Sequence, residues 1–213
     1  MKKYLSLIYL ISLVLLLSAC GTMSIDLKAN GSGQVEIEIP QNDYIGTAKD
    51  LKQQLESEVD DGAGIKKIKV KETKDSTIAS FEFDTLDALD SDSYEIPVSD
   101  LVILGDTILD DLELVKGTKE FTEKSSAILV KLPTNISEFS SSKITVPGKI
   151  VAHSEDASIT KSNVAEFDAD AGSRNYVVYE PKSGIGSIVG IVAVIAIVLG
   201  ALFFIIRKKQ NKK

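Results

Sequence analysis

Side chains able to carry out catalysis are few in this chain of 213 residues. The only histidine, His153, is followed by Ser154, Glu155 and Asp156, which are residue types found in nucleophilic triads. A triad also needs a nucleophile on a sharp turn, and the Gly-x-Ser-x-Gly pattern of such a turn is absent from the sequence. One histidine and one cysteine also provide too few ligands for a catalytic zinc ion. We therefore expect a turn histidine, no enzyme activity, no metal and no cofactor.

Carboxylates dominate the middle of the chain. Between Lys74 and Lys116 there are twelve acidic residues and no basic one. Dense carboxylate oxygens can bind Ca²⁺, but no stretch has the Asp-x-Asp-x-Asp-Gly order and the closing Glu of a calcium loop. Two interpretations stay open: a calcium site in residues 84–113, and a solvated acidic face that contacts a protein of the cell envelope.

Three lysines alternate along one predicted strand. Lys67, Lys69 and Lys71 have the period-two spacing that places side chains on one face of a strand. Such a row could bind a lipid phosphate at the headgroup level of a membrane. The alternative is cross-strand ion pairing, at about 0.2 to 1 kcal/mol for each pair. Its acidic partners would be Glu36, Glu38, Glu82 and Asp84.

The beginning of the chain has the pattern of an export signal. Two lysines precede a nearly unbroken apolar run over residues 5–17. The only cysteine, Cys20, follows in the order Leu17-Ser18-Ala19-Cys20-Gly21, which resembles the lipobox of bacterial lipoproteins. This resemblance implies that residues 1–19 are cleaved as a signal peptide and that the Cys20 thiol carries a diacylglycerol with palmitate-type chains. An ordinary signal peptide beside an incidental thiol is the alternative.

The end of the chain predicts a second membrane anchor. Residues 185–206 carry no charge, and a helix of that length at ~1.5 Å per residue spans about 33 Å, close to the bilayer hydrocarbon thickness. The basic tail, 207–213, favours a cytoplasmic C-terminus. Gly186 and Gly190 form a small-xxx-small pair that could dimerise this helix weakly. We expect a single-pass protein on the outer face of a bacterial cell membrane.

The extracytoplasmic domain is predicted at residues 21–183. It contains all 31 acidic residues and most of the 24 basic ones, so its surface is strongly acidic. That charge excludes nucleic acid as a partner. Because the first strand pattern starts near Met23 and the last ends near Tyr179, short tethers should keep the domain on the outer leaflet.

Strand patterns fill most of this domain. Because strands follow strands without crossover helices, we expect an α+β fold: a mainly antiparallel β-sheet with one amphipathic helix packed on it, plus the C-terminal transmembrane helix. The helix is predicted at 43–59, capped by Asn42 or Asp43. Residues 101–104 fit a strand or a helix equally well. The predicted strands are a hairpin over 23–40, then 65–73, 77–84, 112–122, 127–132, 143–152, 158–167 and 176–179.

A sheet with one helix packed on it can enclose an apolar ligand cavity. The alternative is that the same side chains close into a solid core. The predicted pocket residues are Val35, Ile37, Ile39, Phe81 and Phe83 on the sheet and Leu51 and Leu55 on the helix.

A motif near the end of the domain resembles a known family. Val146-Pro147-Gly148-Lys149-Ile150 is followed by a polar turn at 154–156, then by Asn163 and the aromatic Phe167. This resembles the end of the LppM-type bacterial lipoprotein domain, and the order of lipobox, hairpin, helix, Pro-Gly-Lys strand and membrane helix agrees. The resemblance implies an α+β lipoprotein domain that binds membrane lipid or glycolipid and has no established enzymatic activity. A protein-interaction or assembly module is the competing interpretation.

Overall fold

The computed structural model describes residues 21–41, 47–59, 64–134, 136, 139–169 and 174–182. Within this part the helices are α2 (Ala48–Glu58), α3 (Val98–Leu104) and the short 3-10 helices η1 (Leu86–Ala88) and η2 (Thr107–Asp111). The strands in chain order are β1 (Thr22–Leu27), β2 (Gly33–Pro40), β3 (Ile65–Glu72), β4 (Ser76–Phe83), β5 (Tyr94–Pro97), β6 (Leu112–Leu114), β7 (Ile128–Lys131), β8 (Ser141–Thr145), β9 (Gly148–Ser154), β10 (Ala157–Lys161), β11 (Val164–Asp168) and β12 (Tyr176–Pro181).

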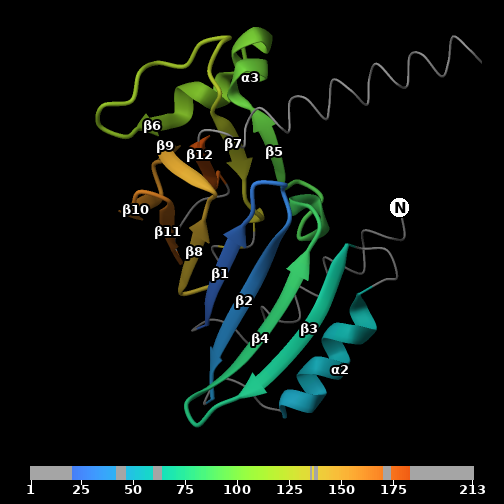
Figure 1. The fold of residues 1–213 in the computed structure, drawn as a ribbon. Coiled ribbons are helices and arrows are strands. Elements are labelled where there is room, and N and C mark those ends of the chain that lie inside the picture. The colour runs from blue at the N-terminus through green and yellow to red at the C-terminus, as the bar shows by residue number, and fades with distance from the viewer. Residues whose placement is uncertain are drawn as a thin grey trace, which may run out of the picture.

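The strands form two separate sheets (Figure 1). The larger has seven strands in the order β10-β11-β8-β1-β2-β4-β3, and the smaller has five in the order β5-β7-β12-β9-β6. The expected α+β class, with one sheet and one packed helix, is therefore wrong. The described domain is mostly β-sheet, and its helices are short. The error arose because a strand pattern shows which residues face a core but not which sheet the strand joins.

The first hairpin is confirmed. β1 and β2 pair antiparallel, with Met23 opposite Ile37 and Ile25 opposite Val35. Gly31 in the connecting turn has φ of 79°, a left-handed conformation that glycine adopts without strain. β2 also pairs with β4, and β4 with β3, so the third and fourth predicted strands are confirmed too.

The larger sheet also contains a parallel pair, which the sequence did not predict. β1 lies beside β8, with Thr22 opposite Ser141 and Ile25 opposite Ile144. Parallel neighbours need a long connection, usually a helix, and the absence of such helices led to the antiparallel expectation. Here the connection includes β2 to β7 and therefore most of the domain.

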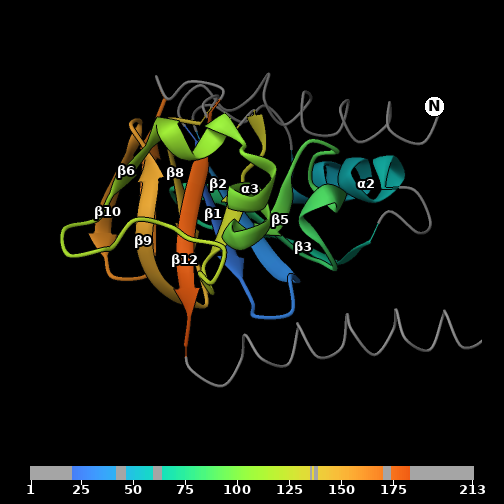
Figure 2. The ribbon, with the colours of Figure 1, turned by 90° about the horizontal axis from the view of Figure 1, so that it is seen from above.

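One predicted strand, 143–152, divides between the two sheets. β8 ends before Val146 and Pro147, and β9 begins at Gly148 in the smaller sheet. Proline has no N–H to donate to the ladder, so it suits the point where the chain leaves the larger sheet. A Cβ atom at Gly148 would lie 2.1 Å from the carbonyl oxygen of Glu180 on β12. Glycine is therefore required for this close pairing, and Figure 2 shows β9 and β12 side by side.

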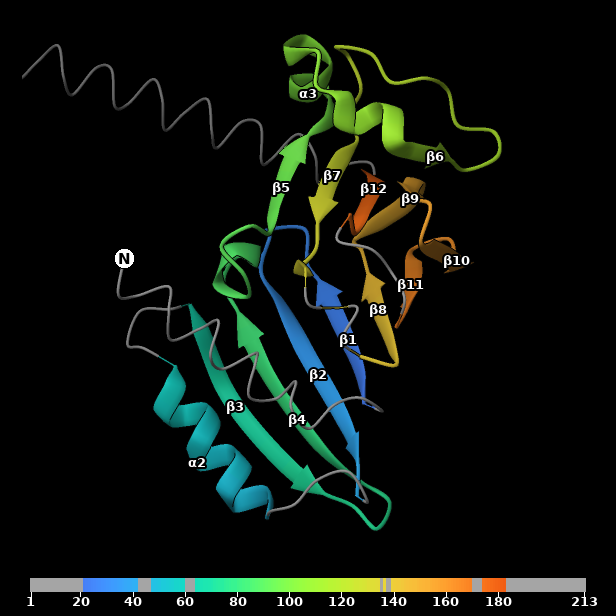
Figure 3. The ribbon, with the colours of Figure 1, turned by 180° about the vertical axis from the view of Figure 1, so that it is seen from behind.

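The main hydrophobic cluster joins the two sheets and α2. Alternate residues of β1 and β2 are buried, among them Ile25 and Ile39. Val177 on β12 belongs to the same cluster, as do Leu51 and Leu55 on α2. Figure 3 shows α2 lying along β3, at the edge of the larger sheet.

The start of α2 differs from the expectation. The Thr47 side chain accepts a hydrogen bond of 3.2 Å from the Asp50 backbone N–H, and the Asp50 carboxylate accepts one of 3.1 Å from the Thr47 N–H. This reciprocal capping box starts the helix at Ala48. The Thr47 hydrogen bonds also lower the pKa of Asp50. The predicted caps, Asn42 and Asp43, lie outside the described residues.

A second hydrophobic cluster covers the other face of the smaller sheet. Val98 and Leu101 on α3 pack with Leu129, Val151 and Val178 of the sheet. Residues 101–104 are thus helical, which decides between the two interpretations of that segment.

No helix in the described ranges is long and apolar enough to cross a membrane. The predicted span at 185–206, the tail 207–213 and the glycine pair Gly186 and Gly190 lie outside those ranges. The same holds for the signal peptide and for Cys20.

Candidate functional site

The residues predicted to line an apolar pocket lie together in the main hydrophobic cluster. Six of them are buried, from 0 % exposure at Ile39 to 7 % at Ile37, and Phe81 is half-buried against the cluster. The seven are Val35, Ile37, Ile39, Leu51, Leu55, Phe81 and Phe83, and none of them lines either of the two clefts described below.

The predicted lysine row is interrupted by a bulge in β3. Lys66 lies opposite Glu82 and Lys69 lies opposite Ser80, so two residues of β3 stand where the partner strand has one. Lys67 is in the bulge, with φ of 55°. The register then places Lys66, rather than Lys67, on the face that carries Lys69 and Lys71.

Two of the β3 lysines have acidic partners. Lys67 Nζ lies 3.0 Å from Glu82 Oε2, and Lys66 Nζ lies 2.6 Å from Asp84 Oδ2. The hydrogen bond from Lys67 lowers the pKa of the Glu82 carboxyl. The exposed Lys67–Glu82 pair matches the cross-strand alternative, whereas Asp84, another of the expected acids, pairs with Lys66, which is outside the predicted row. The contribution of both pairs to stability is small because solvent screens them.

The acidic residues between Lys74 and Lys116 are spread over β4, η1, β5, α3, η2, β6 and the turns between them. Several of their carboxylates bind protein groups: Asp90 accepts from the Thr134 N–H at 3.2 Å, and Asp106 accepts from the Ile108 N–H at 3.0 Å. Within the described ranges, no three acidic, histidine or cysteine residues are grouped so as to hold a metal ion.

One cleft, of about 350 Å³, lies at the end of this acidic segment. Its rim is formed by residues 110–113, by 154–156 and by Arg174, whose guanidinium binds the Asp111 carboxylate. His153 is on β9 beside this cleft but does not line it, and its Nδ1 lies 2.9 Å from the Ser154 carbonyl oxygen.

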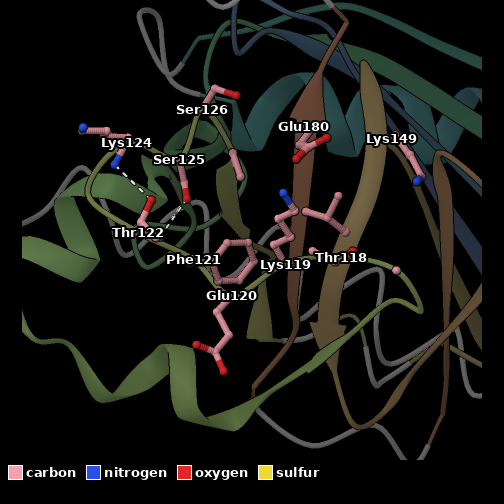
Figure 4. A pocket seen from close by; sticks show the side chains of 13 residues that line it. Thr118, Lys119, Glu120, Phe121, Thr122, Lys124, Ser125, Ser126, Lys149 and Glu180 are labelled. Carbon is pink, nitrogen blue, oxygen red and sulfur yellow. Dashed lines mark hydrogen bonds between the residues drawn. The ribbon is translucent and has the colours of Figure 1, made fainter.

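A second cleft, of about 480 Å³, is lined by three lysines, and we call it the lysine cleft (Figure 4). One wall is the loop between β6 and β7, residues 117–122 and 124–127. The other wall is formed by Lys149 and Val151 on β9 and by Glu180 on β12. Lys149 and Glu180 are directly opposite in the ladder, and Val151 forms a buried floor.

Hydroxyl groups and one glycine shape the loop wall. Gly117 has φ of 91°, which permits the tight turn closed by a 2.9 Å hydrogen bond from Thr118 N–H to the Val115 carbonyl. Further along, the Thr122 N–H donates to Ser125 Oγ at 2.8 Å. The loop is thus held by its own short polar side chains.

The lysine cleft has the chemistry of a site for an anionic, hydroxyl-rich ligand. Lys119, Lys124 and Lys149 supply ammonium groups, and the described ion pairs involve none of them. Serine and threonine hydroxyls and the carboxylates of Glu120 and Glu180 offer further hydrogen-bond partners. Phe121 is half-buried, packs against the second hydrophobic cluster and adds an apolar face.

Sequence reasoning missed this cleft. Residues 112–122 were predicted to be a strand, whereas β6 ends at Leu114. The sequence did contain an indication of the cleft, because the stretch without basic residues is followed directly by three lysines, Lys116, Lys119 and Lys124. Only Lys119 and Lys124 of these line the cleft, and that they share it with Lys149 of β9 depends on the tertiary arrangement.

Comparison with models of protein families, with curated proteins and with solved structures finds no match to this chain.

Proposed function

We propose that this chain is a bacterial cell-envelope lipoprotein, anchored by lipid at Cys20 and by a helix at 185–206, whose domain binds the anionic headgroup of a membrane lipid or glycolipid. The proposed binding site is the lysine cleft, in place of the apolar pocket that the sequence suggested. In this proposal the protein binds its ligand without changing it chemically and does not act as an enzyme.

The main support for the proposal is the short stretch of chain between the cleft and the proposed membrane helix. Glu180 lines the cleft, and β12 ends at the next residue, Pro181. Only residues 182–184 separate that point from the proposed membrane helix. At about 3.5 Å per residue, the five steps from Glu180 to residue 185 reach at most roughly 18 Å, so this edge of the cleft stays close to the start of the proposed span.

Charge gives a second, independent support. The chain has a formal net charge of −7, yet the lining of the cleft contains three lysines and only two acids. Ammonium groups pair well with phosphate oxygens as point charges. The hydroxyl groups of the loop suit the glycerol or sugar part of a headgroup.

The test uses the full-length protein in lipid nanodiscs that contain a photo-cross-linkable phosphatidylglycerol. We expect cross-linked peptides to map to residues 117–127 and to the strand around Lys149, the two walls of the cleft. Lys119→Gln combined with Lys149→Gln should lower the yield about five-fold or more. Lys161→Gln is the matched control, because Lys161 is an exposed lysine of β10 outside the cleft.

A second arm replaces the probe with a photo-cross-linkable glycosyl diacylglycerol. Stronger labelling of the cleft in this arm would identify a glycolipid as the ligand rather than a phospholipid. Cross-links spread evenly over the domain, or unaffected by the double substitution, would refute headgroup binding in this cleft.

A further inference from the structure

We infer that the exposed C-terminal end of α3 is a docking surface for a basic partner protein, one that presents an apolar groove rimmed by lysine or arginine. Ile103 is 65 % exposed and Leu104 is 74 % exposed. We call these two side chains the α3 patch. Figures 1 and 3 both show α3 beyond the end of β5, at one extremity of the described domain.

The exposure of Ile103 follows from helical geometry. Val98 and Leu101 are buried on the side of α3 that packs on the smaller sheet, at 0 % and 3 % exposure. At 3.6 residues per turn, Ile103 must point away from that sheet, whereas Leu104, the last residue of α3, lies about one turn after the buried Leu101 and is nevertheless exposed. A surface helix normally carries polar residues at its exposed positions, so two adjacent large aliphatic side chains are a departure from the usual amphipathic pattern.

The patch is also unusual within this molecule. Among the described residues the large apolar side chains that are exposed are Tyr94, Ile103, Leu104 and Leu114, and the two of the α3 patch are the most exposed. Contiguous exposed apolar surface is characteristic of interaction sites, whereas exposed apolar residues scattered singly are ordinary.

The charged residues closest to the patch along the chain are acidic, and they favour one kind of partner. Asp100 lies in the same helix, and Asp106 follows it after Gly105; both are exposed. No basic residue occurs anywhere between Lys74 and Lys116. A leaflet rich in phosphate would be repelled by these carboxylates, whereas a lysine- or arginine-rimmed groove complements them. The observations therefore favour a basic protein over a membrane.

The α3 patch is separate from the lysine cleft, since neither Ile103 nor Leu104 lines that cleft. The inference therefore does not depend on lipid binding, and each can fail without the other.

The experiment uses the full-length chain in phosphatidylcholine nanodiscs and a fluorescent amphipathic helical peptide made of leucine and lysine as the probe. Fluorescence anisotropy, corrected with empty nanodiscs, should show saturable binding that weakens as salt is added. Ile103→Ser combined with Leu104→Ser should weaken binding about ten-fold or more. Asp100→Asn combined with Asp106→Asn should weaken it less and reduce its salt dependence. Leu114→Ser is the matched control, because Leu114 is an exposed leucine outside the patch.

Three results would overturn the inference. One is equal binding of a peptide in which glutamate replaces lysine, because charge complementarity would then be absent. Another is unchanged binding by the double serine variant, provided circular dichroism shows it folded. The third uses an environment-sensitive dye on Thr107→Cys, at an exposed position of η2. Quenching of that dye by spin-labelled lipids without peptide would show that the α3 end enters the bilayer instead.

Discussion

The Tyr179 hydroxyl donates a hydrogen bond of 3.1 Å to Oε1 of Glu95, and this contact joins β12 to β5 across the intervening strand β7. Burial raises the pKa of the Glu95 carboxyl, and the hydrogen bond from Tyr179 offsets part of that rise. Burial, together with the nearby Glu95, also raises the pKa of Tyr179. Because the Glu95 carboxyl gains or loses a proton, the contribution of this pair to the free energy of unfolding depends on pH.

Glu95→Gln should therefore change how stability depends on pH. The pKa of Glu95 is raised above its ordinary value of 4.5, so the folded state holds this proton more tightly than the unfolded state. Its contribution is present below pH 4.5 and is lost as pH rises through the folded pKa. Urea unfolding at several pH values between 4 and 7 should show the variant gaining stability relative to the unaltered protein as pH rises. A constant difference over that range would contradict the raised pKa.

Tyr179→Phe, in contrast to Glu95→Gln, should lower the free energy of unfolding at neutral pH. Removal of the hydroxyl leaves the partly buried carboxylate of Glu95 without its donor, at a cost of about 1 to 3 kcal/mol. The loss should shrink at acidic pH, where the carboxyl is protonated. Combining both substitutions, Glu95→Gln with Tyr179→Phe, should cost less than the sum of the two, which a double-mutant cycle measures.

Leu51→Ala tests whether the space between α2 and the larger sheet is a core. Leu51 is 2 % exposed within the main cluster, so truncation should lower the free energy of unfolding by about 2 to 5 kcal/mol. Lys52→Ala on the exposed side of the same helix should change it by only a few tenths of a kcal/mol. A small loss of stability at Leu51 together with loss of lipid cross-linking would instead support a pocket wall.

Gly148→Ala tests the glycine of the Pro-Gly-Lys strand. Because the new Cβ would overlap the Glu180 carbonyl, β9 and β12 would have to separate locally, and we expect a loss of about 1 to 3 kcal/mol in thermal or urea unfolding. Lys149→Ala, one residue along, keeps the backbone and should leave stability nearly unchanged. Equal stability of the two variants would show that the ladder tolerates a side chain at position 148.

Cys20→Ser tests the lipid anchor proposed from the sequence Leu17-Ser18-Ala19-Cys20. Without a thiol to acylate, the chain should accumulate as a precursor that keeps residues 1–19, visible as a larger band on a denaturing gel. Normal processing of this variant would contradict the lipoprotein assignment.

Local patterns predicted local structure well here. The alternation of Val35, Ile37 and Ile39 and the turn at Gly31 were sufficient for the β1–β2 hairpin, because both depend on neighbouring residues. Pairing between distant strands was not predictable in this way. The parallel contact of β1 with β8 and the move of the chain to the smaller sheet at Pro147 depend on the tertiary arrangement.

The candidate sites, too, were predictable only where they depend on residues close together in the sequence. Lys67 and Lys69 have the spacing of a common face, but a bulge, which alternation cannot reveal, removes Lys67 from it. The lysine cleft depends on a loop meeting the ends of two strands, with Lys119 and Lys149 brought together from different parts of the chain. In contrast, the exposure of Ile103 follows from helical spacing as soon as the buried side of α3 is known, although that of Leu104, one turn after the buried Leu101, does not.

The parallel contact between β1 and β8 has a consequence for the order of folding. The Gly21 carbonyl accepts hydrogen bonds from both the backbone N–H and the hydroxyl of Ser140, across 119 residues of sequence. Strands β1 to β4 can pair early, since their connections are comparatively short, whereas β8 must close a far longer loop at a greater entropic cost. Until then the outer edge of β1 presents unpaired N–H and C=O groups, so refolding should be slow and most prone to aggregation before β8 docks.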